Sequence, residues 1–150
     1  MCNKNDIQLR LNTLMDKKGL IKRFYHFRSI QNFIHFFDDL ESVQLKEKVY
    51  STLMEYLDIV NKEPIEDIHQ CTELFDQYIR SIGNLYERAF GFAPVLSLWV
   101  FVFWSIVLFS VLYIFNLSII LYFIIGIIVL CYYFYLLKKK RDKKVYGFKW

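Results

Sequence analysis

The stretch from Ala89 to Leu137 contains no Asp, Glu, Lys, Arg or His, and it ends abruptly at the basic residues Lys138–Arg141. A helix that crosses a membrane needs about 20 apolar residues to span a hydrocarbon core of about 30 Å. The stretch is long enough for two such helices, and Asn116 divides it into parts of nearly equal length. We therefore predict a transmembrane hairpin with spans at 94–115 and 117–137, joined by a very tight turn.

The basic residues that follow the hairpin predict its orientation. Residues 138–150 carry seven Lys and Arg and one acidic residue, whereas the rest of the chain has 12 basic and 14 acidic residues. Positively charged flanks stay on the cytoplasmic side of a membrane, and two spans return the chain to the side where it began. The residues after Met1 have no signal-peptide pattern. We therefore predict a bacterial inner-membrane protein with two spans and both termini in the cytoplasm.

The tail, residues 138–150, also predicts a membrane anchor. Lysines beside anionic lipid and aromatic rings at headgroup level are typical interfacial anchors. The predicted anchor comprises Lys138, Lys139, Lys140, Arg141 and Trp150, with Tyr146 and Phe148 as further interfacial rings. Nucleic acid is the alternative partner of such a tail, and its position beside the membrane favours lipid.

Residues 1–90 predict a cytoplasmic bundle of about four helices. Residues 91–94 are predicted to form the junction to the hairpin. Because both parts are expected to be helical, the predicted fold class is all-α. A helix beginning near Leu20 is indicated by apolar residues three and four positions apart. Its predicted face is Phe27, Ile30, Phe33, Ile34 and Phe37; a third helix has Val49, Leu53, Met54, Leu57 and Val60. The segment Glu63–Asp67 predicts a fourth helix start, with Pro64 as its first residue. Gly91 suits its end, and Gly83 is expected to weaken it.

A basic and aromatic segment near the start of the chain is the candidate contact for a partner or a phosphate group. It comprises Lys17, Lys18, Lys22, Arg23, Phe24, Tyr25 and Arg28. Such a segment can bind phosphates and stack on bases, or it can lie on an anionic membrane. Residues 38–76 have the opposite sign, with eleven acidic residues. We favour pairing of the two segments within the chain, with a partner protein, a nucleic acid or lipid headgroups as alternatives.

The remaining polar residues predict no enzymatic chemistry. Cys2, Cys71 and Cys131 are expected to be free thiols. His69 and Cys71 supply only two ligands, whereas a structural zinc site needs four. No catalytic set or phosphate-binding loop is evident. We therefore expect no metal, no cofactor, no small-molecule substrate and no enzyme activity.

One pair of residues favours a second interpretation. Arg28 and His35, with six residues between them, resemble the Arg–His motif of HEPN ribonucleases, which are also small helical bundles. The resemblance implies that these two residues, from two protomers, act on a ribose hydroxyl and a phosphate. The interpretation we prefer is a solvated Arg28 and a His35 at the edge of an apolar stripe.

The predicted spans contain no charged residue, which argues against a transport route or a proton relay. They do contain small residues that would allow close helix contact. These are Ser97, Ser105, Gly126 and Cys131. The sequence therefore predicts hairpin packing at these positions and a homo-oligomer.

The layout as a whole resembles the small two-transmembrane effectors of bacterial anti-phage defence systems, such as those encoded with retrons or nucleotide-signalling operons. The resemblance rests on a helical domain of sensor size followed by the hairpin, without an enzymatic motif. It implies that the helical domain responds to a cytoplasmic protein or ribonucleoprotein regulator and that the hairpin acts on membrane lipid. The alternative is a membrane-anchored binding module, such as a toxin-immunity protein or an assembly subunit, with the acidic segment 38–76 as its contact surface. We favour the effector, because one span suffices for tethering.

Overall fold

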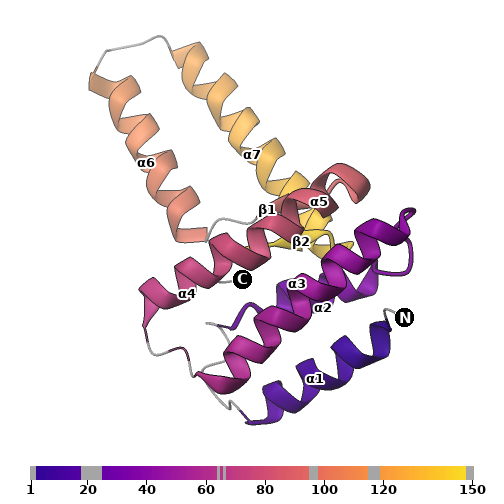
Figure 1. Ribbon diagram of the computed structural model, residues 1–150. Helices are drawn as coiled ribbons and strands as arrows, with labels where there is room; N and C mark the ends of the chain where they lie inside the picture. Colours follow the sequence, from indigo (N-terminus) through magenta and orange to yellow (C-terminus); the bar gives the residue numbers. More distant parts are fainter. Residues whose placement is uncertain are drawn as a thin grey trace.

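The computed structural model describes residues 3–17, 25–63, 65, 67–94, 98–114 and 119–147, and it is mostly helical (Figure 1). The elements are α1 (Lys4–Lys17), α2 (Phe27–His35), α3 (Val43–Lys62), α4 (Ile68–Leu74), η2 (Phe75–Ile79), α5 (Arg80–Phe90), β1 (Ala93–Pro94), α6 (Leu98–Ile114), α7 (Ile119–Arg141) and β2 (Val145–Tyr146). We call α1 to α5 the helical base. The all-α prediction is confirmed as a mostly helical fold, with a short parallel ladder between β1 and β2 as the addition.

Helix α1 lies along α2 and α3 and covers one side of the helical base (Figure 1). Its apolar residues Ile7, Leu11 and Leu14 recur at helical spacing and are all buried. Two ion pairs support this packing at the surface, Lys4 with Asp38 at 2.9 Å and Arg10 with Asp58.

Helix α2 buries the face that the sequence predicts, but it begins later than predicted. Phe27, Ile30, Phe33 and Ile34 are all at most 3% exposed. Phe37 is also buried, but it follows the end of α2 at His35. The residue before the helix, His26, has a left-handed backbone with φ 49°, so no regular right-handed helix runs through it. The predicted start near Leu20 lies outside the described residues, and α2 itself begins at Phe27.

Helix α3 begins at Val43, six residues before the first apolar position used to predict it. Val49, Leu53, Leu57 and Val60 are buried as predicted, and Met54 is half-buried. Tyr56 is also buried on this face, and its hydroxyl donates to the carbonyl oxygen of Tyr25 at 2.7 Å.

The helices α4, η2 and α5 form one helical stretch with a wider π turn in the middle. The stretch begins at Ile68, because Asp67 caps it: the carboxylate oxygen accepts a hydrogen bond from the backbone N–H of Gln70 at 2.8 Å. Pro64, which was predicted as the first helical residue, lies outside the described residues, and the described helix α4 begins at Ile68. The end at Gly91 is confirmed, with φ 66° and a hydrogen bond from its N–H to the carbonyl of Glu87.

Helices α6 and α7 leave the helical base side by side (Figure 1). We call the place where they meet the base, with β1 just before α6 and β2 just after α7, the root of the two helices. Pro94 lies in β1 and α6 begins at Leu98, so Pro94 does not begin the helix as predicted. Helix α7 extends four residues beyond Leu137 and carries the four basic residues in its last turn. Helix α6 has 17 residues and α7 has 23 residues.

Candidate functional site

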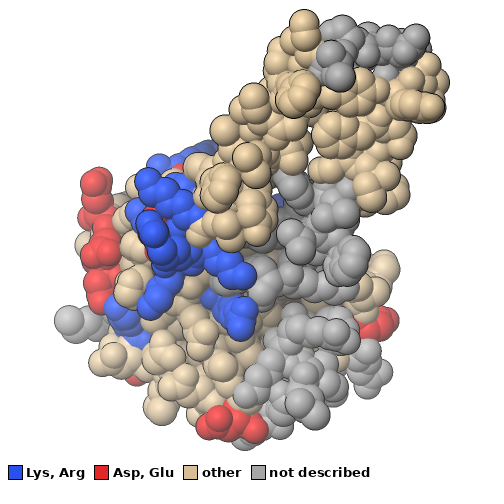
Figure 2. Space-filling view, turned by 180° about the vertical axis from the view of Figure 1, so that it is seen from behind, with Lys and Arg blue, Asp and Glu red and all other residues tan. Residues whose placement is uncertain are grey.

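Large apolar side chains are exposed on α6 and α7. Figure 2 shows no Lys, Arg, Asp or Glu on the described parts of these helices away from the helical base. Among the described residues, all exposed large hydrophobic side chains except Leu9, Val43 and Ile68 belong to these two helices. A helix that is apolar on every side is normally buried in a protein core or in a membrane. The helical base does not cover this surface, so it needs another apolar environment.

Helix α7 is long and apolar enough to cross a membrane, over Ile120–Arg141, and it is the only helix of the described residues that meets both conditions. The described part of α6 is equally apolar but has 17 residues, or about 26 Å at 1.5 Å per residue. The rings of Phe109 and Tyr122 stack between the two helices, with centroids 6.2 Å apart.

The root of the two helices is fastened to the helical base by the ladder between β1 and β2. Ala93 pairs with Val145 and Pro94 pairs with Tyr146, in parallel orientation. The backbone N–H of Ala93 donates to the carbonyl oxygen of Lys144 at 3.0 Å. The segment immediately before α6 is therefore hydrogen-bonded to the segment shortly after α7.

Tyr146 lies inside the helical base and does not act as a membrane anchor, contrary to the sequence prediction. Its side chain is 3% exposed, and its ring passes directly over Gly83. A Cβ atom placed on Gly83 would lie 2.2 Å from this ring. The hydroxyl donates to Asn84 at 3.3 Å and to Glu87 at 3.5 Å, and burial together with the charge of Glu87 raises the pKa of Tyr146. Gly83 thus makes room for Tyr146, which explains the glycine inside a helix.

Side chains of α2 hold the backbone around Tyr146. The Asn32 amide donates to the carbonyl oxygen of Val145 at 2.8 Å, and the Ser29 hydroxyl accepts from the N–H of Gly147 at 3.2 Å. Both side chains are buried, at 8% and 1% exposure. A buried polar group is costly unless it is hydrogen-bonded, so these two residues favour an extended segment at this place.

His26 lies next to the same segment at the start of α2. It is 5% exposed, and its Nε2 atom lies 3.3 Å from the carbonyl oxygen of Cys71. Burial lowers the pKa of His26, and hydrogen bonds with the backbone of Cys71 and Gly147 oppose this shift. The ring is therefore neutral at pH 7.

Aromatic rings join α2, α5 and the junction before α6 at this root. The ring of Phe33 lies 4.9 Å from Tyr86, 5.7 Å from Phe92 and 6.0 Å from Tyr146, measured between centroids. The Tyr86 hydroxyl also donates to the carbonyl oxygen of Phe33 at 2.9 Å. Aromatic contacts of this kind contribute to stability beyond their buried area, so the root is a packed extension of the core.

Lys and Arg side chains gather at the root of the projecting helices (Figure 2), where the last turn of α7 carries Lys138–Arg141. Lys139 contacts the helical base, since its ammonium donates to the carbonyl oxygen of Gly91 at 2.7 Å. The ammonium of Lys144 lies 5.3 Å above the ring of Phe36. Lys138, Lys140 and Arg141 are exposed, as expected for contacts with lipid headgroups. Trp150, the last predicted anchor residue, lies outside the described residues.

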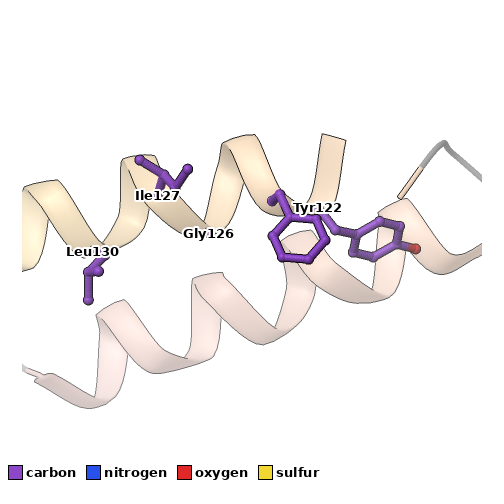
Figure 3. A pocket seen from close by; sticks show the side chains of 5 residues that line it. Tyr122, Gly126, Ile127 and Leu130 are labelled. Carbon is purple, nitrogen blue, oxygen red and sulfur yellow. The ribbon is translucent and has the colours of Figure 1, made fainter. Parts of the chain in front are cut away.

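Three of the four small residues predicted for hairpin packing, Ser105, Gly126 and Cys131, belong to the part of the chain that the structure describes. Gly126 lies in an apolar hollow of α7 that Tyr122, Phe123, Ile127 and Leu130 also line (Figure 3). A Cβ atom on Gly126 would find no atom within 4 Å. Ser105 is half-buried and Cys131 is exposed, and Ser97 lies outside the described residues.

The basic and aromatic segment predicted to contact a partner is described only in part. Residues 18–24, and with them Lys18, Lys22, Arg23 and Phe24, lie outside the described residues, as does the side chain of Lys17. Tyr25, a candidate contact for a partner or a phosphate group, is 2% exposed, and its hydroxyl accepts from the N–H of Ile65 at 3.2 Å, so its ring is part of the core. Arg28 is exposed, as is His35 at the other end of α2.

No group of three or more His, Cys, Asp or Glu side chains that could hold a metal ion occurs among the residues that the structure describes. Cys71 is buried and Cys131 exposed, and both are free thiols as predicted. The Cys71 sulfur lies 3.5 Å from His26 Nε2 inside the core, at 0% exposure for Cys71. This pair is therefore closed to a substrate.

The sequence analysis missed the residues that form the root: Ser29, Asn32, Gly83, Val145 and Tyr146. Their common signal is weak, because they come from three elements that lie far apart in the sequence, α2, α5 and β2. Gly83 inside an apolar helical pattern was the one available sign, since an isolated glycine there often marks a close approach.

Comparison of the chain with protein-family models, with curated proteins and with solved structures found no significant match.

Proposed function

We propose that this chain is a two-span effector of the bacterial inner membrane in an anti-phage defence system. In this proposal α6 and α7 cross the membrane as a hairpin, and both termini lie in the cytoplasm. The helical base responds to a cytoplasmic protein or ribonucleoprotein regulator. Hairpins of several copies then associate and disrupt the membrane.

The observation that carries the proposal is the pair of exposed apolar helices tied at both ends to one folded base. Lipid would cover the side chains of α6 and α7 that the helical base leaves exposed. The ladder between β1 and β2 supports placing both ends of the hairpin on the same side. Lys138, Lys140 and Arg141 would then lie at the cytoplasmic headgroups, in accord with the orientation rule.

The contacts at the root also favour an effector over a passive anchor. A tether needs no fixed geometry, whereas here Lys139, Tyr146 and Asn32 make hydrogen bonds that hold the end of α7 and the residues after it against the helical base. A change in the base could thus be passed to the membrane helices. The hollow around Gly126 offers a surface on α7 that the chain's own α6 leaves open to a second copy.

The test is induced expression in a bacterial host, with propidium uptake and colony counts followed over time. One variant replaces residues 98–137 with an unrelated two-span hairpin and keeps Ala93–Pro94 and Lys144–Gly147, so that the root stays intact. A second variant, Gly126→Leu, fills the hollow on α7.

We expect dye entry and cell death with the native hairpin and at least a tenfold loss of killing with the unrelated hairpin. Equal killing by both hairpins would contradict the effector. Healthy, dye-excluding cells that express the native chain, together with its activating partner, would favour a membrane-anchored binding module such as an immunity protein or an assembly subunit.

A further inference from the structure

The segment Lys144–Gly147, which we call the tail strand, lies in a slot formed by α2 and α5 of the helical base and by β1. Each of these elements contacts it. Ala93 in β1 donates to its backbone, Asn32 in α2 donates to it and Ser29 in α2 accepts from it. Recognition of an extended backbone by an existing strand and fixed polar groups is the way in which protein sites capture peptide strands.

The slot also selects one side chain of the tail strand. The ring of Tyr146 fits over Gly83, where a Cβ atom would come within 2.2 Å. Phe33 packs against the ring at 6.0 Å, and Asn84 and Glu87 accept from its hydroxyl at the far end. The slot therefore has a pocket for tyrosine in addition to its contacts with the backbone.

The connection to α7 is suited to release. The tail strand follows a turn in which Lys143 has φ 57°, a left-handed conformation that is unfavourable for lysine. The ladder with β1 is two residues long. The hydrogen bonds from the Tyr146 hydroxyl are long, at 3.3 Å and 3.5 Å. The tail strand can thus leave the slot without any helix being broken.

From these contacts we propose that the slot is a peptide-binding site and that its ligand is the chain's own tail strand. The tail strand acts as a latch: it detaches and rebinds, and it closes the root of α7 while it is bound. The site depends only on contacts of the helical base and not on the proposed effector function. If that function holds, release of the latch is the step that frees α7 from the base.

The experiment uses the full chain in detergent micelles and a synthetic peptide, Asp142–Gly147, added in trans. The variant Tyr146→Ala vacates the tyrosine pocket, and we expect its melting temperature to fall below that of the wild type. Millimolar peptide should raise the melting temperature of this variant by about 4 °C or more, because a ligand that binds only the folded state stabilises it. The wild-type chain should not respond, since its slot is filled.

Two matched glycine variants in the Tyr146→Ala background locate the binding. Gly83→Ala should abolish the response to the peptide, because its methyl group takes the place of the tyrosine ring. Gly126→Ala is the control, since nothing lies within 4 Å of the added methyl group. A peptide in which alanine replaces the tyrosine should have no effect.

Several results would overturn the proposal. A folded Tyr146→Ala variant that does not respond to the peptide would show that the slot does not bind a separate strand. Loss of the helical circular dichroism signal in Tyr146→Ala would make the tail strand an integral part of the core. A response that persists with Gly83→Ala would place the peptide elsewhere. A wild-type dimer that Tyr146→Ala dissociates would make a second copy the donor of the strand.

Discussion

Single residues at the root show how the same amino acid serves different purposes. Gly83 and Gly126 are both glycines inside helices, where glycine costs up to about 1 kcal/mol relative to alanine. Gly83 allows the Tyr146 ring to pack on the helix backbone, whereas Gly126 has open space around it. The printed sequence does not distinguish them, because the ring over Gly83 comes from a residue 63 positions away.

His26 predicts a dependence of stability on pH. Burial places its pKa in the folded chain below the usual 6.5, so the unfolded chain takes up a proton first as the pH falls. The folded state therefore loses stability from about pH 6.5 downward, until the lowered pKa is reached. We expect a smaller free energy of unfolding at pH 5.5 than at pH 7.5, measured by urea denaturation in detergent.

The variant His26→Asn should reduce this loss of stability, since asparagine also tolerates the left-handed backbone at this position and does not titrate. His35→Asn, at an exposed position of α2, is the matched control and should keep the pH dependence of the wild type. An unchanged slope in His26→Asn would assign the effect to another group.

Among the elements, the helical stretch from α4 to α5 depends for its stability on the residue that caps its start. Asp67 caps it through the hydrogen bond from Gln70, and its backbone is extended at φ −132°. We expect Asp67→Ala to lower the free energy of unfolding by about 1 kcal/mol, because an orphan N–H loses its partner. Asp67→Asn keeps an acceptor and should recover most of the loss, as read from thermal melts. Equal losses in both variants would refute the cap.

Other elements show what periodicity predicts and what it leaves out. The buried faces of α2 and α3 follow from apolar residues at spacings of three and four. The π turn Phe75–Ile79 was not predicted, nor were the two short strands. A two-residue strand has no alternating pattern of its own, and its pairing depends on where the chain returns after α7.

For the whole molecule, the proposed topology predicts that protease reaches both ends of the chain from the same face of the membrane. In inside-out vesicles, endoproteinase Lys-C added outside should cut the helical base and the region after α7, including Lys143. In intact spheroplasts neither end should be cut. Detergent provides the control in which all sites are accessible. Cleavage of one end only, in either preparation, would indicate a single span and contradict the hairpin.

The apolar helices near the end of the chain are predictable from the sequence alone. The charge-free stretch that begins at Ala89 predicted apolar helices, and the basic residues after Leu137 predicted the end of the apolar stretch but not of the helix, which continues to Arg141. Gly91 as a helix end and the apolar face of α2 were likewise predictable.

The burial of Tyr25 and of the residues after α7 depends on the tertiary fold and is not evident in the sequence. From its neighbours in the sequence, Tyr146 is expected to be an exposed ring at a membrane surface. Tyr25 is likewise expected to be an exposed ring on a segment that contacts a partner. In the folded chain both are buried, because Gly83 and Phe33 accept the ring of Tyr146 and Ile65 donates to Tyr25. Burial of this kind depends on contacts between residues far apart in the chain, and such contacts leave no periodic signal in the sequence.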